Sequence, residues 1–206
     1  MQTRKEELWN AISHGLGVLL GIVGFAILLL NNKEKTPYST FSIVAYSLSV
    51  ILLYSASTIY HAVSHLKWKA KLRKLDHISI FFLIAGTYTP VALITLEKGS
   101  GWLIFWIVWG ITLFGTSLKI FFTGKYEALS LILYLVMGWL IIFDIQNLVS
   151  STSFPGLILL MLGGAFYTVG IVFYVIHKIP YNHVIWHFFV LGGSISHFFF
   201  ILFDVI

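Results

Sequence analysis

Seven apolar runs of about 20 residues, separated by short polar segments, dominate the sequence. Each run is long enough to cross a hydrocarbon core of about 30 Å as a helix. The alternating segments typical of a membrane β-barrel are absent. The pattern therefore predicts an all-α integral membrane bundle with seven spans, at residues 12–31, 40–61, 76–96, 101–122, 127–147, 155–177 and 183–206.

Composition supports the same class. Of 206 residues, 58% are hydrophobic and only 10% are charged, which is too little charge to cover the surface of a soluble domain. The runs leave no sizeable soluble segment, and no internal repeat is evident, so residues 1–206 are predicted to form a single membrane domain. Because there is no cysteine, disulfides and thiolate metal ligands are excluded.

Basic residues indicate the orientation of the bundle. One alternating set of segments contains Arg4, Lys5, Lys67, Lys69, Lys71, Arg73, Lys74, Lys119, Lys125 and Lys178; the other contains only Lys33, Lys35 and Lys98. The positive-inside rule places the richer set in the cytoplasm. We therefore expect a cytoplasmic N-terminus and, with seven spans, a C-terminus outside. The net charge of +5 comes mainly from these basic residues and therefore reflects the orientation of the bundle. It accompanies no nucleic-acid motif, so no nucleic-acid partner is expected.

Ionisable residues within the apolar runs are expected to be functional, because a buried charge or polar group is costly in a membrane. His183 and His187 lie about 40° apart on one face of the seventh span. Ser57 and His61 share a face at the end of the second span, and Asp76 opens the third. The predicted topology brings all five to the cytoplasmic end of the bundle.

This combination predicts a metal site. Two histidines at i and i+4 plus a third from another helix can hold zinc with one position left for water, as in catalytic zinc sites. His61, His183 and His187 are the expected ligands. Asp76 would act as a general base or orient the water, and Ser57 would polarise a substrate carbonyl or position the water.

Other histidines compete with this assignment. His65 also forms an i, i+4 pair with His61, but it runs into Lys67 and Lys69, which favours a loop or headgroup role. His77 lies about 100° from the Asp76 face and is expected in helix packing or behind the site. His197 is about 15 Å deeper than His187 and is expected to hydrogen-bond between helices.

Proline interrupts the third predicted span. Pro90 in the sequence GTYTP is expected to kink the helix, with Thr87 and Thr89 available to satisfy the carbonyls that it frees.

The ordered motifs resemble those of the hemolysin III family. They are Glu7-x-x-Asn10-x-x-x-His14, Ser57-x-x-x-His61, LDHISIFFLIAGTYTP from Leu75, and His183-x-x-x-His187. This family is grouped with the progestin and adipoQ receptors and, more distantly, the alkaline ceramidases. The resemblance covers nearly the whole chain. It implies seven helices, a cytoplasmic N-terminus, a place in the bacterial inner membrane, and zinc on His61, His183 and His187 with Asp76 and Ser57 beside it.

The first motif is open to two interpretations. Glu7, Asn10 and His14 form one helical stripe and could donate or accept hydrogen bonds behind the metal ligands. Equally, Glu7 could cap the helix start, where a negative charge suits the helix dipole. His197 is a further candidate for such a role behind the metal ligands.

Three functions fit these features. The leading hypothesis is a zinc-dependent hydrolase that cleaves an amide bond in a membrane lipid, with membrane lipids as its partners. The alternatives are a pore-forming, cytolytic protein in which zinc is structural, and a ligand-sensing membrane receptor. The substrate and the oligomeric state are not encoded in these patterns.

Overall fold

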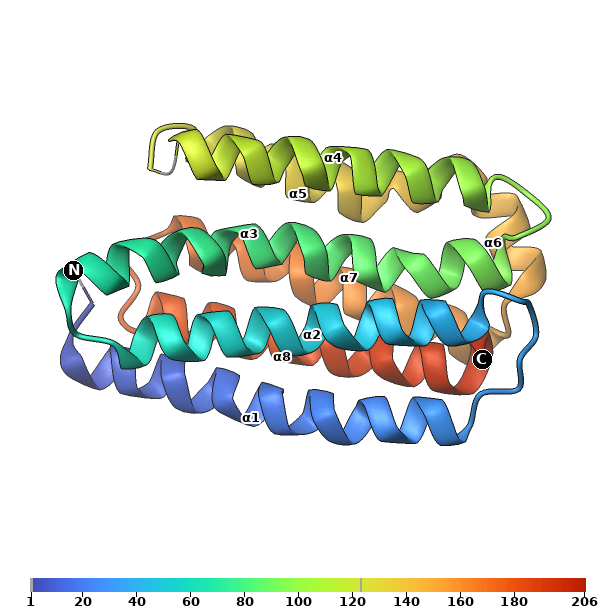
Figure 1. The fold of residues 1–206 in the computed structure, drawn as a ribbon, viewed down its shortest axis with the longest axis horizontal. Helices are drawn as coiled ribbons and strands as arrows, with labels where there is room; N and C mark the ends of the chain where they lie inside the picture. The colour runs from blue at the N-terminus through green and yellow to red at the C-terminus, as the bar shows by residue number, and fades with distance from the viewer. Residues whose placement is uncertain (1, 123) are drawn as a thin grey trace.

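A computed structural model describes residues 2–122 and 124–206 as a bundle of long helices (Figure 1). Within those residues, seven helical segments are long and apolar enough to cross a membrane, and no strand is present. The predicted all-α membrane class is confirmed. The elements are α1 (Arg4–Leu30), α2 (Ser39–Ala62), α3 (Leu66–Pro90), η1 (Val91–Thr95), α4 (Gly101–Phe122), α5 (Glu127–Trp139), η2 (Leu140–Asp144), α6 (Ile145–Ser151), α7 (Phe154–Val175), α8 (Asn182–Phe200) and η3 (Ile201–Val205).

Neighbouring helices along the chain pack side by side. α1 packs on α2, α2 on α3 and α7 on α8, and the bundle closes where α8 returns to α1. The contact between α1 and α2 is close because Gly17 faces Tyr54: a Cβ at Gly17 would lie 2.3 Å from the Tyr54 ring. The two termini lie at opposite ends of the bundle (Figure 1).

Two helices start eight and ten residues earlier than the hydropathy pattern predicted. α1 begins at Arg4 rather than residue 12, because Thr3 and Glu6 form a capping box: Thr3 Oγ1 accepts from the Glu6 amide, and Glu6 Oε2 accepts from the Thr3 amide. α3 begins at Leu66 rather than Asp76. Its first ten residues are good helix formers that hydropathy does not detect because many are charged. Asp76 therefore lies about three turns inside α3 and does not open it.

Two spans also contain local irregularities. After Pro90 the third span continues as the π-helical turn η1, since proline cannot donate to the carbonyl four residues earlier, at Gly86. The expected role of the threonines was wrong: Thr87 and Thr89 donate to the carbonyls of Leu83 and Ala85. The fifth span changes to the 3₁₀ turn η2 and then continues as α6.

Candidate metal centre

Two histidines of the site come from the first turns of α8. This helix begins directly after Tyr181, whose backbone is left-handed with φ of 55°. His183 and His187 are one turn apart and therefore project from the same helix face. Their ring centroids are 4.7 Å apart.

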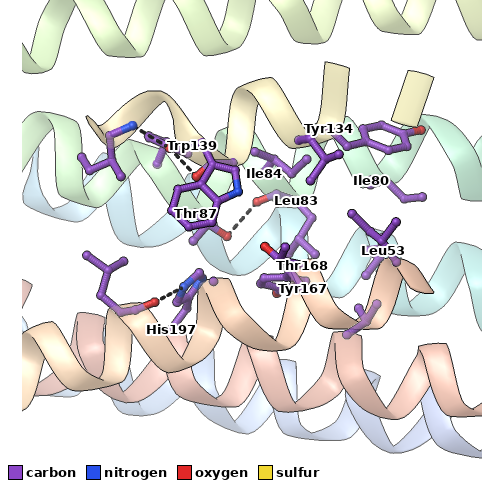
Figure 2. A pocket seen from close by; sticks show the side chains of 18 of the residues that line it. Leu53, Ile80, Leu83, Ile84, Thr87, Tyr134, Trp139, Tyr167, Thr168 and His197 are labelled. Carbon is purple, nitrogen blue, oxygen red and sulfur yellow. Dashed lines mark hydrogen bonds between the residues drawn. The ribbon is translucent and has the colours of Figure 1, made fainter. Parts of the chain in front are cut away.

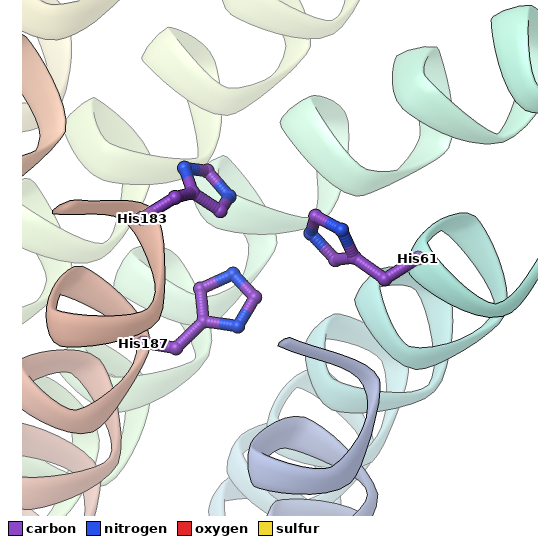
Figure 3. Close-up of side chains that lie close together, drawn as sticks. All are labelled: His61, His183 and His187. Atoms are coloured by element: carbon purple, nitrogen blue, oxygen red, sulfur yellow. The ribbon is translucent and has the colours of Figure 1, made fainter. Parts of the chain in front are cut away.

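The third histidine comes from the last turn of α2. The ring centroid of His61 lies 5.2 Å from that of His183 and 5.0 Å from that of His187. Figure 3 shows the three rings facing one another across the gap between α2 and α8. Their candidate ligand nitrogens all lie within 4.8 Å of one another. This histidine group, His61 with His183 and His187, could hold a metal ion.

Glu7 of α1 fixes the orientation of His61. Its Oε2 lies 2.7 Å from His61 Nδ1, and its Oε1 lies 2.9 Å from Lys69 Nζ. His61 Nε2 is left buried without a hydrogen-bond partner in residues 2–122 and 124–206. A carboxylate on one ring nitrogen with the other nitrogen free is the arrangement that orients metal-binding histidines. The helix cap that the sequence also allowed for Glu7 is made by Glu6.

The opposite side of His187 rests against α1. Its Nδ1 lies 3.3 Å from both the carbonyl oxygen of Asn10 and the hydroxyl of Ser13. The His14 ring stacks on it, with centroids 3.5 Å apart. These contacts leave the Nε2 side of His187 to face the other histidines.

Ser13 is a site residue that the sequence patterns did not predict, and Asn10 takes part through its backbone. The side-chain amide of Asn10 donates to Gln2 Oε1, so the contact with His187 is made by the backbone carbonyl. Ser13 follows Asn10 by three residues and shares the helical stripe of Glu7, Asn10 and His14. Extending that stripe would have identified it.

Asp76 and Ser57 lie beside the histidine group in one cavity. Both are buried, and both line this cavity together with His183 and His187. The Ser57 hydroxyl is buried without a hydrogen-bond partner among the described residues. Asp76 is not a member of the group whose ligand atoms lie within 4.8 Å.

The remaining histidines have other contacts. His197 Nε2 lies 3.3 Å from the Leu160 carbonyl oxygen, which is the predicted hydrogen bond between helices. His77 Nδ1 lies 3.5 Å from Glu127 Oε2. His65 is exposed at the start of α3 and does not belong to the histidine group.

The bundle and the histidine group together define a multi-pass membrane protein with a buried site that could hold a metal ion. Residues 2–198 match the family model described as haemolysin-III related. The chain belongs to this family, as its ordered motifs had indicated.

Similar proteins cover almost the full length of the chain. The hemolysin-3 homolog of Bacillus subtilis (strain 168) is 45% identical over 98% of this chain and 96% of its own length. Hemolysin-3 of Bacillus cereus is 43% identical over 98% of this chain and 93% of its own length. The human monocyte to macrophage differentiation factor is 28% identical over 94% of this chain and 82% of its own length. Together with the apolar helices, these findings identify a multi-pass protein of the bacterial inner membrane.

Proposed function

We propose that the protein is a zinc-dependent hydrolase that cleaves an amide bond in a membrane lipid. One observation carries the proposal: His183 and His187 of the histidine group line the same apolar cavity within the bundle as Asp76. A metal-binding group, a carboxylate and space for an acyl chain are the components that such a reaction requires.

The donor set suits zinc. Imidazole nitrogens bind zinc at about 2.0–2.1 Å, and a tetrahedral centre then separates its nitrogens by roughly 3.4 Å. The nitrogens of the histidine group already lie within 4.8 Å, so a small inward movement completes the geometry. The buried, unpartnered His61 Nε2 is the nitrogen that would bind. When bound, zinc supplies a Lewis acid with a fourth position open.

The cavity suits a lipid chain. It has a volume of about 370 Å³, within the usual range for small-molecule sites. It extends from Asp76 and His183 past Ile84, Tyr134 and Thr168, which are labelled in Figure 2, to Val149 near the other end of the bundle. Its walls are mostly aliphatic and aromatic. An acyl chain would fill it, with the amide group at the histidine end.

Asp76 is the candidate proton carrier. Water adds to the amide carbonyl carbon while an Asp76 carboxylate oxygen accepts a proton from that water. The same oxygen then returns the proton to the nitrogen as the C–N bond breaks, giving a carboxylic acid and an amine. The Ser57 hydroxyl, buried beside Asp76, would donate to the carbonyl oxygen or hold the water.

We further propose that the histidine end of the bundle faces the cytoplasm. The ten basic residues counted above favour this orientation. Reporter fusions at both termini test it, with a cytoplasmic N-terminus and an external C-terminus expected. A cytoplasmic C-terminus would contradict it.

A second candidate follows from the names of two relatives. Both Bacillus proteins are called hemolysin-3 or its homolog, which favours a membrane-lytic function with a structural metal. A structural metal needs no proton carrier, so Asp76 separates the two candidates.

Asp76→Asn in liposomes is the deciding experiment. We expect wild-type protein to release fatty acid from ceramide or another N-acyl lipid in a screened panel. Asp76→Asn should keep its metal and fold but lose about 10²–10⁴-fold in rate. Dye leakage from empty liposomes is measured in parallel. Leakage that persists in Asp76→Asn, with no hydrolysis by wild type on any lipid, would favour the lytic function.

A further inference from the structure

α3 is much longer than a membrane span requires. The segment Leu66–Thr95 has 30 residues, or about 45 Å of helix, against a hydrocarbon core of about 30 Å. Residues 66–75 hold five lysines and arginines and no acidic residue. The start of α3 is therefore a basic extension at the level of lipid headgroups.

Arg73 is the residue of this extension that continues the cavity wall. Asp76, His77 and Ile80 line the cavity, and they follow Arg73 by three, four and seven residues, so they share its helix face. The guanidinium lies 3.6 Å from Glu127 Oε1, and the other oxygen of that carboxylate lies 3.5 Å from Nδ1 of the cavity-lining His77. Arg73 thus lies at the histidine end of the cavity.

The guanidinium of Arg73 keeps donors available. Its ion-pair partner among the described residues is Glu127, at 3.6 Å, and its side chain is 46% exposed. Glu127 Oε2 already lies 2.5 Å from Lys119 Nζ and 3.5 Å from His77 Nδ1. A long, exposed ion pair of this kind contributes little to stability, so the Arg73 guanidinium can leave Glu127 and bind another anion.

Lys69, one turn before Arg73, is in a different situation. Its ammonium lies 2.9 Å from Glu7 Oε1 and donates to the carbonyls of Tyr60 and Val63. Those contacts hold Lys69 on α1 and α2, whereas the Arg73 guanidinium keeps donors for a ligand at this end of the cavity.

We propose that Arg73 binds the phosphate of an anionic lipid whose acyl chain lies in the cavity. The planar guanidinium offers paired N–H donors that match phosphate oxygens. Because the cavity beside Arg73 is apolar, the phosphate belongs to a lipid and not to a free ion. The inference rests on the proposed function, since it narrows the class of substrate to an N-acyl lipid with a phosphate headgroup; phosphatidylglycerol serves below as a binding probe for the phosphate and the acyl chain.

Lipid binding tests the inference without any turnover. Purified protein in detergent is titrated with phosphatidylglycerol and with diacylglycerol of the same chains, and bound lipid is counted by native mass spectrometry. Wild type should prefer phosphatidylglycerol by at least about tenfold, which one charge-assisted contact supplies. Arg73→Gln should lose the preference, and Arg73→Lys should keep part of it and serve if Arg73→Gln does not fold.

Lys71→Gln is the matched control. Lys71 belongs to the same extension and is exposed, but it projects about 160° around the helix from Arg73. The Lys71→Gln variant should bind both lipids as wild type does. If Lys71→Gln and Arg73→Gln lose the preference for phosphatidylglycerol equally, the attraction is diffuse and the proposal is overturned. A wild type without any preference would also overturn it.

Competition with inorganic phosphate separates a lipid from a free ion. Displacement of phosphatidylglycerol at millimolar phosphate would contradict a lipid-specific site. Phosphatidylglycerol binding that depends on Arg73 but accompanies no hydrolysis of any lipid would reject the proposed reaction and retain the ligand.

Discussion

The two ends of the bundle use their acidic side chains in different ways. At the end opposite the histidines, Asp144 accepts from the Ser100 amide and hydroxyl and from Asn147 Nδ2. Asp204 accepts from the Ser153 amide and hydroxyl. Ser100 and Ser153 directly precede α4 and α7, so both carboxylates satisfy donors at helix starts, where negative charge is favourable.

At the histidine end the polar groups are arranged around a space. Glu7 holds one nitrogen of His61 and leaves the other buried and unpartnered. Asp76 faces the cavity and is not used to cap a helix. Buried polar groups that lack hydrogen-bond partners are costly in a membrane protein, and they are found where a bound ligand supplies the missing partner. The opposite end is therefore interpreted as structural and the histidine end as functional.

Removing a histidine tests this contrast with the largest expected effect. His187→Ala should lose nearly all bound zinc, because the remaining two histidines hold zinc poorly against competition. His197→Ala is the matched control, since His197 is on the same helix but bonds the Leu160 carbonyl. Elemental analysis of both purified variants is the measurement. Equal zinc contents in His187→Ala, His197→Ala and wild type would contradict the assignment of His187 as a zinc ligand.

Removing the carboxylate behind His61 should have an intermediate effect. Glu7→Ala should weaken zinc binding by about 10–100-fold, the usual cost of losing a group that orients a metal-bound histidine. Competition with a chelator of known affinity measures it. Glu6→Ala, which removes the helix cap one residue earlier, should leave zinc affinity nearly unchanged. An equal loss in both variants would indicate damage to α1 instead.

A substitution at the end opposite the histidines should change stability and leave zinc binding unchanged. Asp144→Ala leaves the Ser100 donors unpaired and should lower the free energy of unfolding by about 1–2 kcal/mol. Zinc affinity should not change. Thermal unfolding in detergent and chelator competition measure the two quantities. A loss of zinc affinity in Asp144→Ala would mean that the two ends are coupled.

Hydropathy predicted the fold well and the helix ends less well. The fourth span begins and ends where α4 does, at Gly101 and Phe122. The third was predicted to begin ten residues late, because hydropathy reports apolar side chains and Leu66–Leu75 is largely charged. From the sequence, the extension that carries Arg73 indicates only the orientation of the bundle.

The part of the site that lies on a single helix was predictable from residue spacing. His183 and His187 share a face by spacing alone, and the motifs added His61 and Asp76. The contact between Glu7 and His61 could not be chosen over a helix cap, because it depends on how α1 rotates and slides against α2. Sequence periodicity does not contain that information. The cavity was also not foreseen, since it arises between helices that are distant in sequence.

The coordination of the metal tests the central claim most directly. X-ray absorption at the zinc edge should be recorded on the purified wild-type protein. We expect about one zinc per chain, bound by three imidazole nitrogens at about 2.0–2.1 Å and one oxygen ligand in the fourth position. A protein purified without stoichiometric metal, or a zinc spectrum without imidazole scattering, would contradict the assignment of His61, His183 and His187 as a zinc centre.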